Sequence, residues 1–271
     1  MITPLILAAV VTIGVPGKPV LEYHHDATAF KPYVAQLYTP AGVALLRDNV
    51  VDHKHHHGLM FAVAADGVDF WSETEKCGRQ VERQFSTNAT GIVQQLDWVS
   101  SDGKVILRED RTITIHPGKV ELLTWHSQLS SANDVTLTGQ HYFGLGARFV
   151  SSMDKVGTFN SSGATTGSVV RGSEKMIPAN WCAYTAPVNG KPVTLAMFDS
   201  PSNPRSPAQM FTMLQPFSYL SATLNLWKQP LLLKAGEPLV LRYGVAAWDG
   251  QPSRDEIEKL YQSWLKTTQR P

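Results

Sequence analysis

Hydrophobic and polar residues alternate with a period of two in short segments along most of the chain. Such alternation puts apolar side chains on one face of an extended segment, so it favours β-strands over helices. The clearest strand-like segments are residues 33–38, 92–98 and 119–125, together with the wholly apolar residues 59–63. Turn-forming pairs such as Asp66-Gly67 and Asn189-Gly190 are flanked by alternating segments, as hairpin turns are. We therefore expect a mainly β protein built as an antiparallel β-sandwich.

The end of the chain departs from this pattern. Ser253 and Glu256 have the spacing of a capping box, which marks the start of a helix. The apolar residues that follow fall on one helical face: Ile257, Leu260, Tyr261, Trp264 and Leu265. We expect a C-terminal helix from about Ser253 that packs across the sandwich through Trp264.

Alternation is weakest between Ser151 and Ser173, a stretch rich in Ser, Gly and Thr. This composition is typical of a long surface connection, an irregular edge or a lid. Strand-like alternation resumes on both sides of it, so we expect residues 18–271 to form a single domain.

Composition excludes several classes of partner. Hydrophobic residues make up 43% of the 271 residues, enough to form a folded core. The 24 Lys and Arg residues nearly balance the 23 Asp and Glu residues, and no basic run is present, so nucleic acid is not expected as a partner. No internal stretch approaches the roughly 20 apolar residues that a membrane-spanning helix needs. Cys77 and Cys182 are expected to be separate buried thiols, with a disulfide as the alternative.

The longest apolar run is Ile2 to Val15. Its length and position fit the hydrophobic region of a secretory signal peptide, although no Lys or Arg precedes it. We expect residues 1–17 to be a signal peptide and the protein to be periplasmic or secreted. A first β-strand and a misplaced start codon are the alternatives.

Four of the nine histidines lie between Asp52 and Gly58. If this segment is extended, His53, His55 and His57 share one face and His56 lies on the other. Imidazole binds zinc, copper, iron or nickel, and its ordinary pKa also suits proton transfer near neutral pH. His53, His55 and His56 are therefore candidate catalytic residues, and His53 and His55 are candidate ligands of a divalent metal ion. A solvated polar loop is the alternative.

A second group of candidates lies between Gln140 and Arg148, which we expect to form one strand. His141 and Arg148 are candidate catalytic residues that could converge on the histidine cluster. Gly144 and Gly146 favour a bulge or a close approach of a ligand to the backbone. Alternatively, His141 is a core histidine and Arg148 pairs with a carboxylate.

Six segments resemble the bacterial family catalogued under the label methane oxygenase PmoA. They are residues 31–33, 39–42, 52–58, 67–71, 144–148 and 199–205. In that family the histidine motif runs Asp-His-Pro-His-His-Arg-Gly, so His53, His55 and His56 match, whereas Lys54 replaces proline and His57 replaces arginine. Because the arginine is replaced, it is an open question whether position 57 binds an anion or a hydroxyl group.

The family label names a membrane enzyme, whereas this chain has no internal spanning segment and is patterned as strands. The resemblance instead implies a secreted β-sandwich similar to the galactose-mutarotase-like folds. It implies a carbohydrate-active hydrolase, lyase or epimerase whose partner is a small-molecule carbohydrate. A non-catalytic carbohydrate-binding or cell-surface module and a soluble copper- or iron-dependent oxidase are the alternatives. The candidate substrate-binding residues are Lys31, Tyr33, Trp71, Glu73, Asn203 and Arg205.

Overall fold

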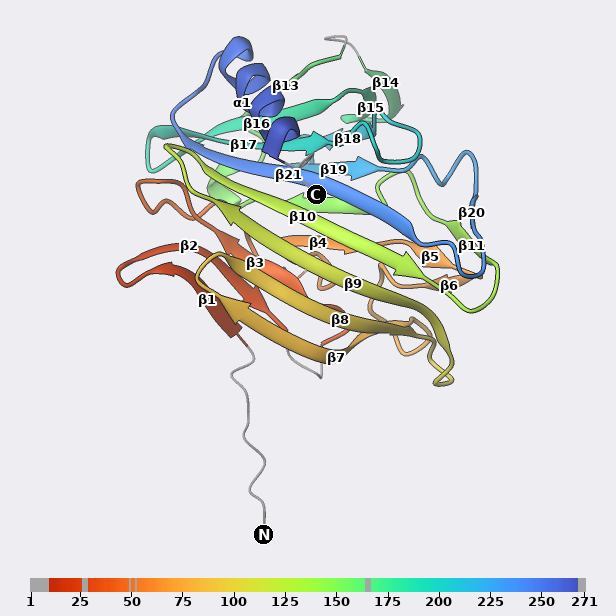
Figure 1. The fold of residues 1–271 in the computed structure, drawn as a ribbon. Helices are drawn as coiled ribbons and strands as arrows, with labels where there is room; N and C mark the ends of the chain where they lie inside the picture. The colour runs from red at the N-terminus through yellow and green to blue at the C-terminus, as the bar shows by residue number, and fades with distance from the viewer. Residues whose placement is uncertain (1–9, 26–28, 49, 52, 164–166, 268–271) are drawn as a thin grey trace.

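A computed structural model describes residues 10–25, 29–48, 50–51, 53–163 and 167–267. In this part of the chain, the strands form three antiparallel sheets (Figure 1). The largest has nine strands in the order β1 (Val10–Val15), β2 (Lys18–His24), β3 (Tyr33–Leu37), β4 (Leu59–Ala62), β12 (Gly144–Arg148), β19 (Tyr219–Thr223), β18 (Gln209–Met213), β15 (Glu174–Pro178) and β14 (Ser168–Arg171).

The second sheet has eight strands in the order β13 (Thr158–Ser161), β16 (Trp181–Val188), β17 (Lys191–Asp199), β21 (Leu239–Asp249), β10 (Glu121–Ser130), β9 (Val105–His116), β8 (Gly91–Val99) and β7 (Arg79–Asn88). The smallest sheet has the order β20 (Leu231–Leu233), β11 (Val135–Thr138), β5 (Ala64–Ala65) and β6 (Val68–Asp69). A short 3-10 helix spans Ser151–Met153, and helix α1 spans Arg254–Thr267. The prediction of a mainly β, antiparallel fold with a C-terminal helix is confirmed.

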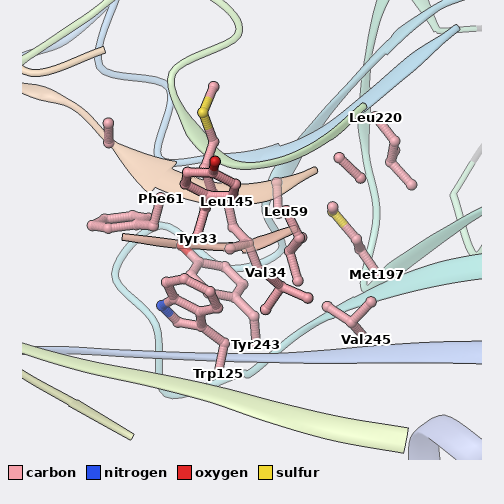
Figure 2. Close-up of a cluster of buried hydrophobic side chains, with 14 of the residues drawn as sticks. Tyr33, Val34, Leu59, Phe61, Trp125, Leu145, Met197, Leu220, Tyr243 and Val245 are labelled. Carbon is pink, nitrogen blue, oxygen red and sulfur yellow. The ribbon is translucent and has the colours of Figure 1, made fainter. Parts of the chain in front are cut away.

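The inner faces of the two large sheets form the main core, as Figure 2 shows. Leu59, Leu145 and Leu220 contribute from the nine-stranded sheet, and Trp125 and Val245 contribute from the eight-stranded sheet. All five side chains are fully buried. Burying these two apolar faces against each other is the main favourable contribution to folding.

Side-chain alternation determines which residues lie on the outer face of the nine-stranded sheet. Leu145 points into the core, so Gly146 and Arg148 on the same strand point the opposite way. The same argument applied to β19 puts Leu220 in the core and Tyr219 on the outer face. The register pairs Arg148 with Tyr219, so these two outward side chains are neighbours.

Helix α1 packs on the outer face of the eight-stranded sheet (Figure 1). Its capping box forms as expected, because the Ser253 hydroxyl accepts from the Glu256 backbone N–H and the Glu256 carboxylate accepts from the Ser253 N–H. Trp264 is fully buried against the sheet, and its Nε1 donates to Thr124 Oγ1 at 2.8 Å. Both predictions about this helix are confirmed.

Three further predictions concern single regions of the chain. The segment between residues 151 and 173 supplies an edge strand to each large sheet, β13 and β14, so it is an edge rather than a featureless connection. Residues 140–143 form a turn, closed by the Phe143 N–H donating to Gln140 O, so His141 precedes β12 instead of lying in it. Cys77 and Cys182 are separate buried thiols, as expected.

The predicted signal peptide falls partly outside the described residues, which begin at Val10. Val10–Val15 form β1, which pairs with β2 and corresponds to the alternative of a first strand. Cleavage and export stay predictions. Within the described residues, no helix has the length and apolar character needed to cross a membrane.

We predict that Trp264→Ala lowers the free energy of unfolding by about 3–5 kcal/mol, because it removes a fully buried ring and leaves Thr124 Oγ1 without this donor. Chemical denaturation monitored by circular dichroism measures this loss. Ser263→Ala, at the exposed neighbouring position, is the control and is expected to change stability by less than about 0.5 kcal/mol. A Trp264→Ala variant as stable as that control would contradict the packing described.

Candidate functional site

A cavity of about 350 Å³ opens above the outer face of the nine-stranded sheet. Its wall combines three imidazoles, several aromatic and apolar side chains, and a charged pair. The lining residues are His53, His55, His56, Tyr142, Arg171, Glu174, Phe211, Met213, Pro216, Phe217 and Tyr219. The structure thus brings together three of the five candidate catalytic residues.

The histidine segment is a turn and not a strand. The His53 N–H donates to Val50 O, and the His56 N–H donates to His53 O at 2.8 Å. The prediction that His53, His55 and His57 share one face is therefore wrong, because the turn breaks the two-residue alternation on which it rested. Asp52 lies outside the described residues.

The turn packs the three cavity imidazoles against one another. The ring centroids of His53 and His56 are 4.8 Å apart, those of His55 and His56 are 4.5 Å apart, and those of His53 and His55 are 5.9 Å apart. Burial is the main cause that lowers the pKa of His56 to about 2, and the neighbouring His55, His53 and Arg148 contribute to this value. Burial, together with Lys31 and His53, also lowers the pKa of His55. His55 and His56 are accordingly neutral near pH 7.

Arg148 lies behind the cavity wall rather than in it. Its guanidinium carbon is 3.5 Å from the centre of the Phe217 ring, and the arginine is buried. Phe217 in turn contacts the rings of His53 and His56, at centroid distances of 4.7 and 5.4 Å. Arg148 thus reaches the histidines through an aromatic ring, and its charge helps to keep His56 neutral.

His141 also lies behind the cavity wall and contacts one of the residues that form it. Its Nε2 lies 3.1 Å from Glu174 Oε2, and the other oxygen of that carboxylate accepts from Arg171 at 2.7 Å. Glu174 and Arg171 line the cavity, whereas His141 does not. The ring of Trp227, which is 40% exposed, lies 5.7 Å from His141. This side of the site therefore offers a carboxylate, a guanidinium and an exposed indole.

Lys31, Tyr33 and Glu73 meet around His57. His57 Nδ1 lies 2.6 Å from Asp48 Oδ1, and its Nε2 lies 2.7 Å from Glu73 Oε1. Glu73 Oε1 also accepts from the buried Lys31 Nζ at 2.6 Å, and Asp48 Oδ2 accepts from the Tyr33 hydroxyl. These candidate substrate-binding residues therefore bind one another, next to the cavity but outside its lining.

The pKa values in this network follow its contacts. Burial lowers the pKa of His57, but the hydrogen bonds to Asp48 and Glu73 outweigh burial, so the pKa lies above its usual value. Burial raises the pKa of Glu73, but His57 and Lys31 lower it more. Burial lowers the pKa of Lys31 by more than Glu73 raises it. In this network the positive charges of Lys31 and His57 offset the negative charges of Asp48 and Glu73. It is therefore not arranged to bind a further ion.

Trp71 is buried beside the histidines, with its ring 6.4 Å from that of His56. Among the described residues, the buried Trp71 Nε1, His56 Nδ1 and Tyr219 hydroxyl have no hydrogen-bond partner. Their three rings are neighbours, since the Tyr219 ring is 5.1 Å from His56 and 6.3 Å from Trp71. Buried polar atoms normally have a partner. His56 and Tyr219 line the cavity, so this part of the wall is suited to a polar group of a ligand, whereas Trp71 is not among the lining residues.

Two candidate substrate-binding residues are elsewhere. Asn203 is buried and bonds to Asp199 and to the backbone of Arg242. Arg205 donates to three backbone carbonyl groups, those of Leu224, Gln229 and Pro230. Both side chains brace loops, and neither lines the cavity.

The glycines of β12 make room for protein atoms. A Cβ at Gly144 would collide with the backbone carbonyl of Ala222, and a Cβ at Gly146 would collide with the Tyr219 hydroxyl. The registers of β12 with β4 and β19 are continuous, so the expected bulge is absent from these pairings. At both positions the group that approaches is part of β19, and the close approach of a ligand stays a prediction.

Within the described residues, no group of three or more His, Cys, Asp or Glu side chains is arranged to hold a metal ion. His53 and His55, the predicted ligands, therefore supply two donors without a third from the described part of the chain. Sequence reasoning also missed Asp48, Glu174, Phe217 and Tyr219. Tyr219 had a usable signal in the alternation of residues 219–223, whereas the other three join the site through contacts that no local pattern indicates.

The model of a family of unknown function, DUF6807, matches residues 10–262. None of the curated proteins searched matches the chain. One similar solved structure is a GH36 alpha-galactosidase from Geobacillus stearothermophilus in complex with raffinose, with a TM-score of 0.35, 10% identity, and coverage of 84% of this chain and 31% of that chain. Another is a protein assigned as a kojibiose phosphorylase from the human microbiome, with a TM-score of 0.34, 10% identity, and coverage of 96% and 35%. The chain spans about a third of the length of each of these proteins.

We predict that the cavity histidines make the protein labile to acid. His56 has a pKa near 6.5 when unfolded and about 2 when folded, so below pH 6.5 the unfolded chain takes up a proton that the folded chain does not. Stability from this group is therefore full above pH 6.5 and falls as the pH drops, by up to about 1.4 kcal/mol per pH unit. Thermal denaturation between pH 6.5 and 4.5 measures the slope.

His56→Gln is expected to flatten this pH dependence, because the glutamine amide does not titrate. Lys54→Gln, at an exposed position in the same turn, is the control and should keep the slope of the unaltered protein. Equal slopes in all three proteins would show that His56 is not buried as a neutral ring.

Proposed function

We propose that this chain, which belongs to the family of unknown function DUF6807, is a carbohydrate-active enzyme that binds a neutral sugar in the histidine-lined cavity. The observation that carries this proposal is the combination of neutral imidazoles, aromatic rings and the Arg171–Glu174 pair in one cavity of about 350 Å³. A volume in this range holds a small ligand. Polar groups that converge within an otherwise apolar wall are typical of sites for small molecules.

The charges around the cavity favour an uncharged ligand. His55 and His56 are neutral near pH 7, and the Arg171 guanidinium is paired with Glu174. An anionic or cationic ligand would have to break that pair or stay uncompensated. A sugar instead offers hydroxyl groups that both donate to and accept from imidazole and carboxylate groups.

Aromatic rings suit the apolar C–H face of a sugar ring. Three aromatic residues line the cavity: Phe211, Phe217 and Tyr142. The exposed Trp227 lies beside His141, which in turn contacts Glu174 in the cavity wall. Such rings supply contact area for the sugar ring, and the polar groups orient the ligand through its hydroxyl groups.

Proton transfer is assigned to His53 and His55, and binding is assigned to His56. A group with a pKa of about 2 is too weak a base to take a proton near neutral pH, so His56 serves as a hydrogen-bonding group. His55 is half-buried and neutral, and it can accept a proton from a sugar hydroxyl, a C–H group or a water molecule. Hydrolysis, elimination and epimerisation all require such a step.

The second candidate function is non-catalytic sugar binding. The low pKa of His56 and the contacts of both Glu174 oxygens with His141 and Arg171 favour it, because neither group is then available for proton transfer.

Turnover of a panel of neutral glycosides and oxidised glycosides separates the two functions. Binding of a panel member without its conversion would support the module, and failure of every member to bind would refute both.

For any panel member that is converted, we predict that His55→Ala lowers turnover by a factor of about 100 or more, as expected for loss of a general acid or base. His126→Ala is the matched control, because His126 is also a half-buried histidine but lies on β10, outside the cavity lining. Steady-state kinetics of both variants at equal folded concentration measures the effect. Equal turnover in the two variants would remove His55 from the mechanism.

We further predict that Tyr219→Phe weakens binding of that sugar by about tenfold while leaving the fold intact, because it removes only a buried hydroxyl that has no partner among the described residues. Isothermal titration gives the affinity, and thermal denaturation checks the fold. Unchanged affinity would mean that the ligand does not reach this part of the wall.

A further inference from the structure

His57 joins two carboxylates that come from different parts of the chain. Its Nδ1 lies 2.6 Å from Asp48, and its Nε2 lies 2.7 Å from Glu73. A neutral imidazole donates from one nitrogen only, so a ring that donates to both carboxylates carries a proton on each nitrogen. Hydrogen bonds that pair an imidazolium with carboxylates are among the stronger ones in proteins.

The neighbours of His57 complete this bridge. The Tyr33 ring stacks on the imidazole with a centroid distance of 4.1 Å and an angle of 13°, and its hydroxyl donates to Asp48 at 2.6 Å. Lys31 donates to Glu73 at 2.6 Å. The bridge therefore connects the end of the histidine turn to Asp48, to Tyr33 at the start of β3, and to Glu73 in the segment that follows Trp71.

We propose that His57 is a positioning residue for the cavity: by bridging Asp48 and Glu73, it fixes the turn that presents His53, His55 and His56. His57 follows this turn directly and is not part of the cavity lining. The effect on turnover rests on the proposed function, whereas the positioning itself is testable without a ligand.

Removing the imidazole would take the shared donor from between two acids. The charged and titratable groups that contact His57 or its partners include Lys31, Tyr33, Asp48 and Glu73, with His55 next to them. Without His57, Lys31 still contacts Glu73 and Tyr33 still contacts Asp48, but nothing named among these contacts joins the two carboxylates to the histidine turn. The loss of a cation that joins two carboxylates is expected to displace the segment that carried it.

The experiment compares His57→Ala with His57→Arg in the full chain. Arginine can donate to two carboxylates at once, keeps its charge and stacks on an aromatic ring, so it can rebuild the bridge. Two-dimensional NMR of the imidazole nitrogens of His53, His55 and His56 reports on the turn. We expect alanine to shift these signals and to lower turnover by about tenfold or more, and arginine to restore both. Lys54→Ala, exposed in the same turn, is the control and should leave the signals in place.

Unchanged imidazole signals in His57→Ala would overturn the proposal, and so would an arginine variant that shifts them as alanine does. If His57→Ala does not fold, Tyr33→Phe takes its place, since it removes only the hydroxyl that donates to Asp48. A smaller shift of the same signals is then expected, and no shift overturns the proposal. If the unaltered protein binds none of the glycosides, the proposed function fails while the NMR result still decides the role of His57.

Discussion

Arg111 is a charge buried completely between the two large sheets, and its partners determine how those sheets are joined. It forms an ion pair with Glu109 at 2.8 Å and donates to the Tyr23 hydroxyl on β2, to Gln80 on β7 and to Pro32 O. A buried guanidinium without partners would be strongly destabilising, so these contacts have to form together. The contact with Pro32 fixes the residue between Lys31 and Tyr33. The same buried charge that joins the sheets therefore positions two side chains of the network around His57.

The candidate site is built on the face of the sheet that the core does not use. Alternation turns Leu145 and Leu220 inward, so Arg148 and Tyr219 point outward at neighbouring positions. An arginine on that face needs a partner, and Arg148 pairs with Asp154 at 3.8 Å. It also packs against Phe217, which contacts the rings of His53 and His56. The strands thus supply the floor together with Arg171 and Glu174, and the three histidines come from a turn that lies on it. This division is the usual one for sites that need precision and variety together.

The fold could be predicted from the sequence because it depends on local periodicity. Alternation over residues 92–98 and the apolar stripe that includes Trp264 each report which face is buried, and the structure follows them. The site could be predicted only in part. Clustering along the chain brought His53, His55 and His56 together, but the turn that groups them depends on hydrogen bonds to Val50 and His53 that alternation cannot encode. Glu174 is 118 or more residues away from these histidines, so only the folded chain reveals it.

The side chain at position 57 faces Asp48 and Glu73 rather than the cavity. The resemblance expected from residues 52–58 would put an arginine at this position. Both arginine and a doubly protonated histidine are planar cations that donate in two directions. Lys31 contacts Glu73, and the two carboxylates need a further cation between them, whichever residue supplies it. The raised pKa of His57 is the consequence of that need, since the carboxylates stabilise the protonated ring. His55 and His56 stay neutral beside it because burial is the largest influence on their pKa values.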